Sequence, residues 1–98
     1  MKRGGCVYIM TNKNHTTLYV GVTSALYDRV YEHKNKIYKN SFTAKYNLTQ
    51  LVWYESYGRI EEAISFEKII KTKSRSYKIE LINKSNPDWK DLWGDELL

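Results

Sequence analysis

Two runs of β-branched and aromatic residues lie close together near the start of the chain, at Cys6–Thr11 and Thr17–Val22. Between them, Asn12–His15 has the polar composition of a turn. Two strand-like runs that are joined by a short turn favour an antiparallel hairpin. The chain is therefore expected to build its core on a β-sheet that begins with this hairpin.

The hydrophobic pattern after the hairpin predicts one more strand and three helices. In chain order these are a helix from about Ala25 to Tyr38, an exposed polar loop at Lys39–Asn47, a strand at Gln50–Ser56, and helices from about Ile60 to Thr72 and from about Ser76 to Lys84. Thr23 or Ser24 can cap the first helix, and Pro87 ends the last one. The order β-β-α-β-α-α predicts an α/β fold: a small sandwich of one three-stranded, antiparallel-type sheet with flanking helices.

Apolar residues at helical spacing predict that each helix buries one face. In the first helix this stripe is made up of Leu26, Val30 and Ile37. The second helix has a broad apolar face, which consists of Ile60, Ala63, Ile64, Phe66, Ile69 and Ile70. Three large apolar residues of the tail are expected to hold it on the body: Trp89, Leu92 and Trp93.

With 98 residues the chain has room for one core, so residues 1–98 are expected to form a single domain. Cys6 is the only cysteine, which excludes an intrachain disulfide and a cysteine-rich zinc site and favours a reducing, cytoplasmic compartment. The first residues alternate too soon for a signal peptide, and no stretch is long and apolar enough to span a membrane. No membrane partner is therefore expected.

Positive charge is concentrated in the middle of the chain. The formal net charge is +5, and the segments Arg29–Lys45 and Lys68–Lys78 hold five basic residues each and a single acid, Glu32. The tail from Asn86 to Leu98 is acidic instead. This distribution favours a basic face for a polyanion such as nucleic acid, although two solvated helix faces would give the same pattern.

Glu67 is in phase with the apolar stripe of the second long helix, in register with Ala63 and Ile70. An ionised carboxylate on a buried face needs a partner or a bound cation. One reading is an i,i+4 ion pair with Lys71 at the edge of the stripe, and the other is a metal ligand. The helix pattern alone leaves both readings open.

Four more candidate residues fall into two pairs. Arg29 and His33 are one turn apart on the first helix, so their side chains can converge on one anion. Tyr8 and Tyr19 lie on neighbouring strands of the hairpin, where a cross-strand aromatic pair is a common feature of a core. Taken singly, each residue fits an ordinary surface or core position at least as well as a functional one.

The spacing of these residues along the chain is a more specific signal than any one of them alone. Cys6-Val7-Tyr8 is followed by Tyr19-Val20-Gly21, whose tyrosine comes eleven residues after the first, and then by Arg29, His33 and Glu67. This arrangement resembles the GIY-YIG nuclease family, most closely its small stand-alone proteins, from Cys6 to about Leu92. Cys6-Val7 stands where the family's name has Gly-Ile, and Tyr19-Val20-Gly21 is a conservative form of the second motif.

The resemblance implies a catalytic site with one divalent metal ion, Mg²⁺ or Mn²⁺. Glu67 would ligate this ion, Arg29 would steady the scissile phosphate, and a tyrosine would activate the attacking water. Tyr8 is favoured as this base, with Tyr19 positioning the phosphate or a water. The reverse assignment of the two tyrosines remains open.

Three more residues are expected in this site: His33 and Asn86 as catalytic residues and Gly21 as a nucleic-acid-binding residue. His33 would relay the proton or bind phosphate, and Gly21 would let the substrate or the following turn approach closely, although it also fits a plain strand end. Family members place an asparagine late in the site. Asn86 is the first candidate for it and Asn83 the second, and a residue that ends a helix before Pro87 is the structural alternative for Asn86.

The expected partner is nucleic acid, with DNA favoured over RNA. Lys45, Lys71 and Arg75 are candidates for contacts to its backbone, and exposed tyrosines such as Tyr38 and Tyr46 for stacking on unpaired bases. Cleavage is expected to be weakly specific or to depend on a branch, flap or single-stranded end, in DNA repair or processing, by a monomer or weak homodimer. The alternatives are a non-catalytic nucleic-acid-binding module on the same fold and a purely structural interaction domain.

Overall fold

The structure, a computed structural model, describes residues 4–98. In chain order its elements are β1 (Gly5–Thr11), β2 (Leu18–Thr23), α1 (Leu26–Lys34), α2 (Phe42–Lys45), β3 (Gln50–Tyr57), α3 (Ile60–Thr72), α4 (Arg75–Ser85) and a short 3-10 helix, η1 (Asp95–Leu97). The three strands and the three longer helices follow the predicted order β-β-α-β-α-α, with the short α2 inserted between α1 and β3.

The strands form one antiparallel sheet in the order β2-β1-β3. β1 lies in the centre, and all of its residues are buried, as expected for a strand of mostly apolar residues between two neighbours. Tyr8 pairs with Gly21 on one side and with Tyr54 on the other. The predicted hairpin and the predicted antiparallel sheet are confirmed, and β2 and β3 form the two edges.

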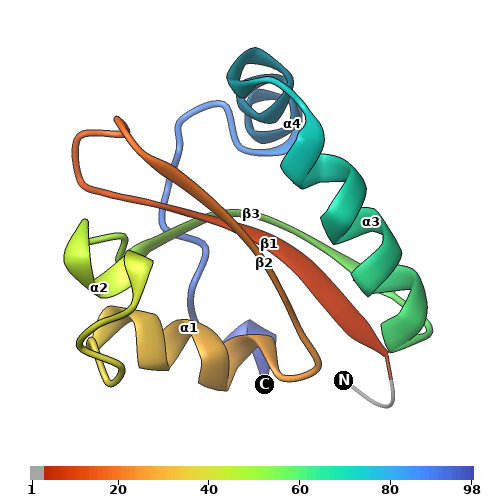
Figure 1. Ribbon diagram of the computed structural model, residues 1–98, viewed down its shortest axis with the longest axis horizontal. Helices are drawn as coiled ribbons and strands as arrows, with labels where there is room; N and C mark the ends of the chain where they lie inside the picture. The colour runs from red at the N-terminus through yellow and green to blue at the C-terminus, as the bar shows by residue number, and fades with distance from the viewer. Residues whose placement is uncertain (1–3) are drawn as a thin grey trace.

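Helices cover both faces of the sheet (Figure 1). α3 and α4 pack on one face, and α1, α2 and η1 lie on the other. Side chains of β1 alternate between these faces: Val7 and Ile9 join the cluster under α3 and α4, and Cys6, Tyr8 and Met10 join the cluster under α1. The molecule therefore has three layers, with the sheet in the middle.

The first helix is shorter than predicted. α1 ends at Lys34, and Lys36 then adopts a left-handed conformation with a φ of 51°, which an α-helix cannot continue through. Ile37 is consequently 54% exposed, so its predicted place in the apolar stripe is wrong. Leu26 and Val30 are buried as predicted.

The segment predicted as an exposed loop, Lys39–Asn47, contains the helical turn α2. This turn begins after Ser41, whose side chain accepts a hydrogen bond from the N–H of Ala44. Thr43 and Ala44 are buried. The prediction of a wholly exposed loop is therefore wrong, because the turn packs two of its side chains inward.

α3 buries a narrower stripe than predicted. Ala63, Glu67 and Ile70 are its buried residues. Three apolar residues of the predicted face are instead exposed: Ile64, Phe66 and Ile69. Because a straight helix contacts a sheet along one line, residues at the sides of the apolar face can remain in solvent.

The tail packs back on the body, as predicted. The N–H of Leu92 donates to the carbonyl of Leu51 over 2.7 Å, and Trp93 stacks on Tyr27 with ring centroids 4.6 Å apart. Trp89 packs against the cluster under α3 and α4. Within residues 4–98, none of the helices combines the length and the apolar character that crossing a membrane requires.

Candidate active site

Tyr8 lies at the centre of a group of polar and aromatic side chains on the α1 face of the sheet. It is 1% exposed, and its hydroxyl oxygen is 2.8 Å from Nε2 of His33. The ring centroids of Tyr8 and Tyr19 are 6.3 Å apart, so the two phenols do meet across the hairpin. Burial raises the pKa of the Tyr8 phenol and Tyr19 adds to the rise, whereas the guanidinium of Arg29 opposes it. Tyr8 is therefore a neutral phenol at neutral pH.

Gly21 lies opposite Tyr8 in the hairpin and makes room for its ring. A Cβ at position 21 would lie 2.5 Å from the Tyr8 hydroxyl oxygen and 2.9 Å from Cε2 of Tyr19. Both distances are well below van der Waals contact. The two tyrosines therefore require a glycine here. A contact between Gly21 and nucleic acid stays a prediction.

His33 links α1 to α2. Its Nδ1 lies 2.8 Å from the hydroxyl of Thr43, while its Nε2 faces Tyr8. Burial, together with the positive charge of Arg29, lowers the pKa of His33 to about 4. The imidazole is therefore neutral at neutral pH, and it donates a hydrogen bond to one neighbour and accepts one from the other. Thr43 was not predicted as a partner of His33, because its segment was expected to be an exposed loop.

Arg29 lies one turn before His33 on α1, with about a third of its side chain exposed. Its Nη1 is 2.8 Å from Oε1 of Glu32, and its guanidinium carbon is 5.6 Å from the centroid of the Tyr38 ring. Partial burial acts to lower the pKa of Arg29, but the interactions with Glu32 and Tyr8 outweigh it, so the pKa is raised. A permanent cation is therefore held beside the Tyr8 phenol. The sequence analysis did not identify Glu32 as its partner.

Glu67 is buried on α3 and 8% exposed. Its Oε2 is 2.6 Å from Nζ of Lys71, so the ion pair expected as one of the two readings is present. Lys71 also reaches the edge strand β2, where its Nζ is 6.0 Å from the centroid of the Tyr19 ring. Lys71 therefore links the carboxylate of Glu67 to the ring of Tyr19 on the edge strand.

These contacts bring together side chains from both helical layers at the β2 edge of the sheet. Glu67 and Lys71 come from α3 on one face, and Arg29 and His33 come from α1 on the other (Figure 1). Tyr19, on β2 itself, contacts both groups. The arrangement combines two cations, a carboxylate, a neutral imidazole and two phenols, a set that can bind a phosphodiester and move a proton.

Asn86 is not joined to this group by any contact within the described residues. It is the C-cap of α4. Its amide donates to the carbonyls of Val52 and Lys90, and its side-chain oxygen accepts from the N–H of Lys90. These bonds fix α4 to β3 and to the tail, so the contacts do not support its expected place in the site. Asn83, the second candidate, accepts a hydrogen bond from the indole of Trp89.

The other residues expected to bind a nucleic-acid backbone come from three different helices, α2, α3 and α4. Lys45 is exposed at the end of α2. Arg75 donates to the carbonyl of His15 and so ties the start of α4 to the β1–β2 turn. The contacts of Lys45, Lys71 and Arg75 with nucleic acid stay predictions.

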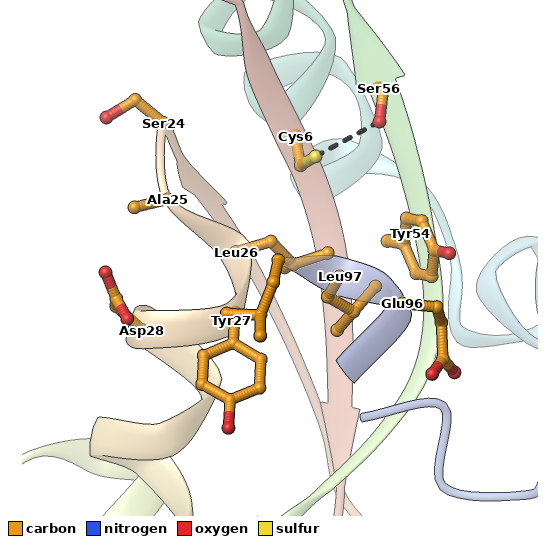
Figure 2. Close-up of a pocket in the computed structure, with 11 residues that line it drawn as sticks. Cys6, Ser24, Ala25, Leu26, Tyr27, Asp28, Tyr54, Ser56, Glu96 and Leu97 are labelled. Carbon is orange, nitrogen blue, oxygen red and sulfur yellow. Dashed lines mark hydrogen bonds between the residues drawn. The ribbon is translucent and has the colours of Figure 1, made fainter. Parts of the chain in front are cut away.

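A separate pocket of about 410 Å³ opens near the start of α1 (Figure 2). Its walls include Cys6 and Ser56, whose Sγ and Oγ atoms are 3.3 Å apart, and the carboxylates of Asp28 and Glu96. None of the site residues described above lines this pocket. The candidate site at the edge of the sheet therefore does not coincide with this hollow.

The donor set at the β2 edge fits a magnesium or manganese ion that keeps most of its water ligands. Residues 4–98 contain no group of three or more His, Cys, Asp or Glu side chains that could hold a metal ion. Glu67 supplies one hard carboxylate, and Mg²⁺ commonly takes one or two carboxylates together with water and substrate phosphate. Lys71, now paired with this carboxylate, has a side chain that is 50% exposed and can move aside.

Known proteins resemble this chain in sequence and in fold. The family model of the GIY-YIG catalytic domain matches residues 4–86. A UPF0213 protein from Pediococcus pentosaceus is 36% identical over 69 residues, which cover 70% of this chain and 72% of that protein. The fold resembles the solution structure of a UPF0213 protein from Bacillus halodurans, with a TM-score of 0.56 and 24% identity over 90% of this chain and 92% of that chain.

Proposed function

Because the chain belongs to the GIY-YIG catalytic-domain family, a family of nucleases, we propose that it is an endonuclease that hydrolyses phosphodiester bonds with the help of one divalent metal ion. DNA is the favoured substrate. The proposal is carried by one observation: side chains from β1, β2, α1 and α3 meet at a single edge of the sheet. These are Tyr8, Tyr19, Arg29 and Glu67 with its partner Lys71.

The cations of the site bind the substrate in this proposal. Arg29 presents a planar guanidinium that can donate to two phosphate oxygens at once. Lys71, on the other side of Tyr19, supplies a second positive charge. When bound at Glu67, a magnesium or manganese ion supplies Lewis-acid stabilisation of the charge that develops on the phosphate.

Burial divides the roles of the two tyrosines. The Tyr8 hydroxyl is buried against His33, whereas Tyr19 is only partly buried on the edge strand, where water can reach it. We therefore assign the direct contact with the attacking water to Tyr19, the reverse of the preference from the sequence. Tyr8 supports Tyr19 and Arg29, and His33, which is 4% exposed, fixes the Tyr8 hydroxyl instead of binding phosphate.

The test is cleavage of labelled branched, single-stranded and duplex DNA, and of RNA, with and without Mg²⁺ or Mn²⁺. Glu67→Gln and Arg29→Ala are each expected to reduce cleavage by about 100-fold or more while the far-UV circular dichroism stays unchanged. Glu61→Gln, an exposed carboxylate on the same helix as Glu67, is the matched control. Full activity of Glu67→Gln, or cleavage without any metal, would contradict the proposal.

A second candidate is a non-catalytic nucleic-acid-binding module on the same fold. The observation in its favour is the Glu67–Lys71 ion pair, because it occupies the carboxylate that a metal would need. Binding that weakens with salt, with no cleavage under any metal, would select this candidate.

We further propose that residues 1–98 act as one domain and that the protein works in the cytoplasm, in DNA repair or processing, as a monomer or weak homodimer. Apolar clusters on both faces of a single sheet support one domain. The single cysteine supports a reducing compartment. Sedimentation of the purified protein over a range of concentrations tests the oligomeric state.

A further inference from the structure

Two aromatic side chains of α2, Phe42 and Tyr46, lie together in solvent beside the candidate site. They are 46% and 50% exposed, and their ring centroids are 4.7 Å apart. Phe42 also stacks on Tyr19, with centroids 6.2 Å apart and 28° between the ring planes. We name Phe42 and Tyr46 the α2 platform. It is continuous, through Tyr19, with the edge where the phosphate is proposed to bind.

The α2 platform is held in place by the fold. Thr43, between its two rings in sequence, bonds to the buried His33 over 2.8 Å. Leu48, which is completely buried, anchors the end of the segment, and Lys36 bonds to Asn47 across its base. Because aromatic side chains on a fixed backbone lose little freedom on binding, such a surface can hold a flat ligand at a low entropic cost.

The segment that carries the α2 platform is rich in lysine. Between Glu32 and Glu55 the sequence contains four lysines and no acidic residue. Lys34 is ion-paired with Asp91 of the tail, whereas Lys45 belongs to α2 and is exposed. The guanidinium of Arg29, with the Tyr38 ring beside it, lies on the preceding helix. Aromatic faces among positive charges are the chemistry that binds single-stranded nucleic acid, because the cations pair with phosphates and the rings stack on bases.

We propose that the α2 platform stacks an unpaired base next to the cleaved phosphate. It thereby selects nucleic acid with single-stranded character, at a flap, a loop or a free end, over continuous duplex. The inference deepens the nuclease proposal and rests on it for the position of the phosphate. Bases inside a duplex cannot use the platform, because both of their faces are already stacked on neighbours. Stacking accepts every base, so the selection is for structure and not for sequence.

The test measures binding in EDTA, where metal-dependent cleavage does not occur. A labelled mixed-sequence DNA strand and a duplex of the same length are titrated by fluorescence anisotropy at several salt concentrations. Phe42→Ala and Tyr46→Ala are each expected to weaken binding of the single strand by about 5- to 100-fold, and binding of the duplex by less than about two-fold. Tyr46→Phe, which keeps the ring, is expected to bind as the unaltered protein does.

Phe66→Ala is the matched control, because Phe66 is also 46% exposed but lies on α3. A 2-aminopurine base in the single strand gives a direct readout, since its fluorescence is quenched when it stacks. Phe42→Ala is expected to remove this quenching. Phe42→Leu keeps apolar bulk at the position, so it should fold, as checked by thermal melting, and still lose the quenching.

Three outcomes would contradict the proposed role of the α2 platform. The first is an equal loss of affinity for single strand and duplex, and the second is the same loss of affinity in Phe66→Ala. The third is competition by a polyglutamate peptide as effective as competition by the single strand. Cleavage assays separate this inference from the proposed function. Selective binding of the single strand without cleavage under any metal would support base stacking on the platform and contradict the nuclease function. Equal cleavage of flap and duplex, unaffected by Phe42→Ala, would contradict only the base-stacking role.

Discussion

At the scale of single residues, the position of the Tyr8 ring depends on the missing side chain of Gly21. We expect Gly21→Ala to lower the free energy of unfolding by about 1–3 kcal/mol, because the added methyl group overpacks a buried contact. Urea denaturation measures this loss, and cleavage by the folded variant should fall as well. Gly58→Ala is the control, since a Cβ at position 58 meets no atom within 4 Å. Similar losses in the two variants would contradict the proposed steric role of Gly21.

His33 gives the stability a pH dependence in acid. Its pKa is about 4 in the folded protein and 6.5 in the unfolded chain. As the pH falls from 6.5 to 4, the unfolded state takes up a proton that the folded state does not, so the free energy of unfolding decreases. The slope is at most about 1.4 kcal/mol per pH unit. Urea denaturation across this range should show the decrease, and His33→Gln should flatten it. An unchanged slope in His33→Gln would assign the effect to other groups.

The residues found from sequence rest on two kinds of signal. Glu67 interrupts an apolar stripe, which the periodic pattern of its own helix reveals, whereas the two tyrosines, Arg29 and His33 stand out only through their joint spacing. Thr43 and Glu32 carry no such signal, because their roles come from the partners that the fold brings to them. For Asn86 the family resemblance implies a place in the site, while its hydrogen bonds fix the end of α4, and its catalytic role stays a prediction.

At the scale of elements, the sequence predicted each strand and each long helix but not all of their limits. α1 ends just before Lys36, which has a positive φ. Lysine adopts this conformation rarely, so nothing in the local sequence predicts the end of the helix here. α2 has four residues, too few for hydrophobic periodicity to reveal it. How many residues of α3 are buried depends on the shape of the sheet surface that the helix packs on. The sequence of the helix alone does not give this shape.

α4 is joined to β3 and to the tail through the side chain of Asn86. Asn86→Ala would leave the buried carbonyl of Val52 and the polar groups of Lys90 without this partner. The free energy of unfolding is expected to drop by about 1–3 kcal/mol in urea denaturation. Asn83→Ala, which removes one exposed bond to Trp89, should cost less. A fully folded and stable Asn86→Ala protein that no longer cleaves would instead restore the catalytic role expected from sequence.

At the scale of the whole molecule, stability comes from the two apolar clusters on either side of the sheet. Residues 4–98 hold no group of three or more side chains that could hold a metal ion. Chelation is therefore expected to abolish cleavage while shifting the thermal unfolding midpoint by less than about 3 °C, as for a weakly held ion. Thermal melts in EDTA and in Mg²⁺ measure this shift. Unfolding on addition of EDTA would show that the ion holds the fold together.

The layered architecture follows from the order of the elements and their periodicity, as the sequence predicted. The convergence of side chains from α1 and α3 on Tyr19 does not, because it depends on how the two helices lie on opposite faces of the sheet (Figure 1). Residues far apart in the sequence, such as His33 and Lys71, become neighbours of Tyr19 only after this packing.

The location of Tyr19 on an outer strand of the sheet also governs how a long polymer can approach. An active site enclosed in a tunnel admits only a nucleic-acid strand with a free end, because the strand must be threaded through the tunnel. An outer strand of a sheet admits the chain from the side, at any point along its length. A covalently circular strand should therefore reach this site as readily as a linear one, and incision within a strand is the natural outcome of such an approach.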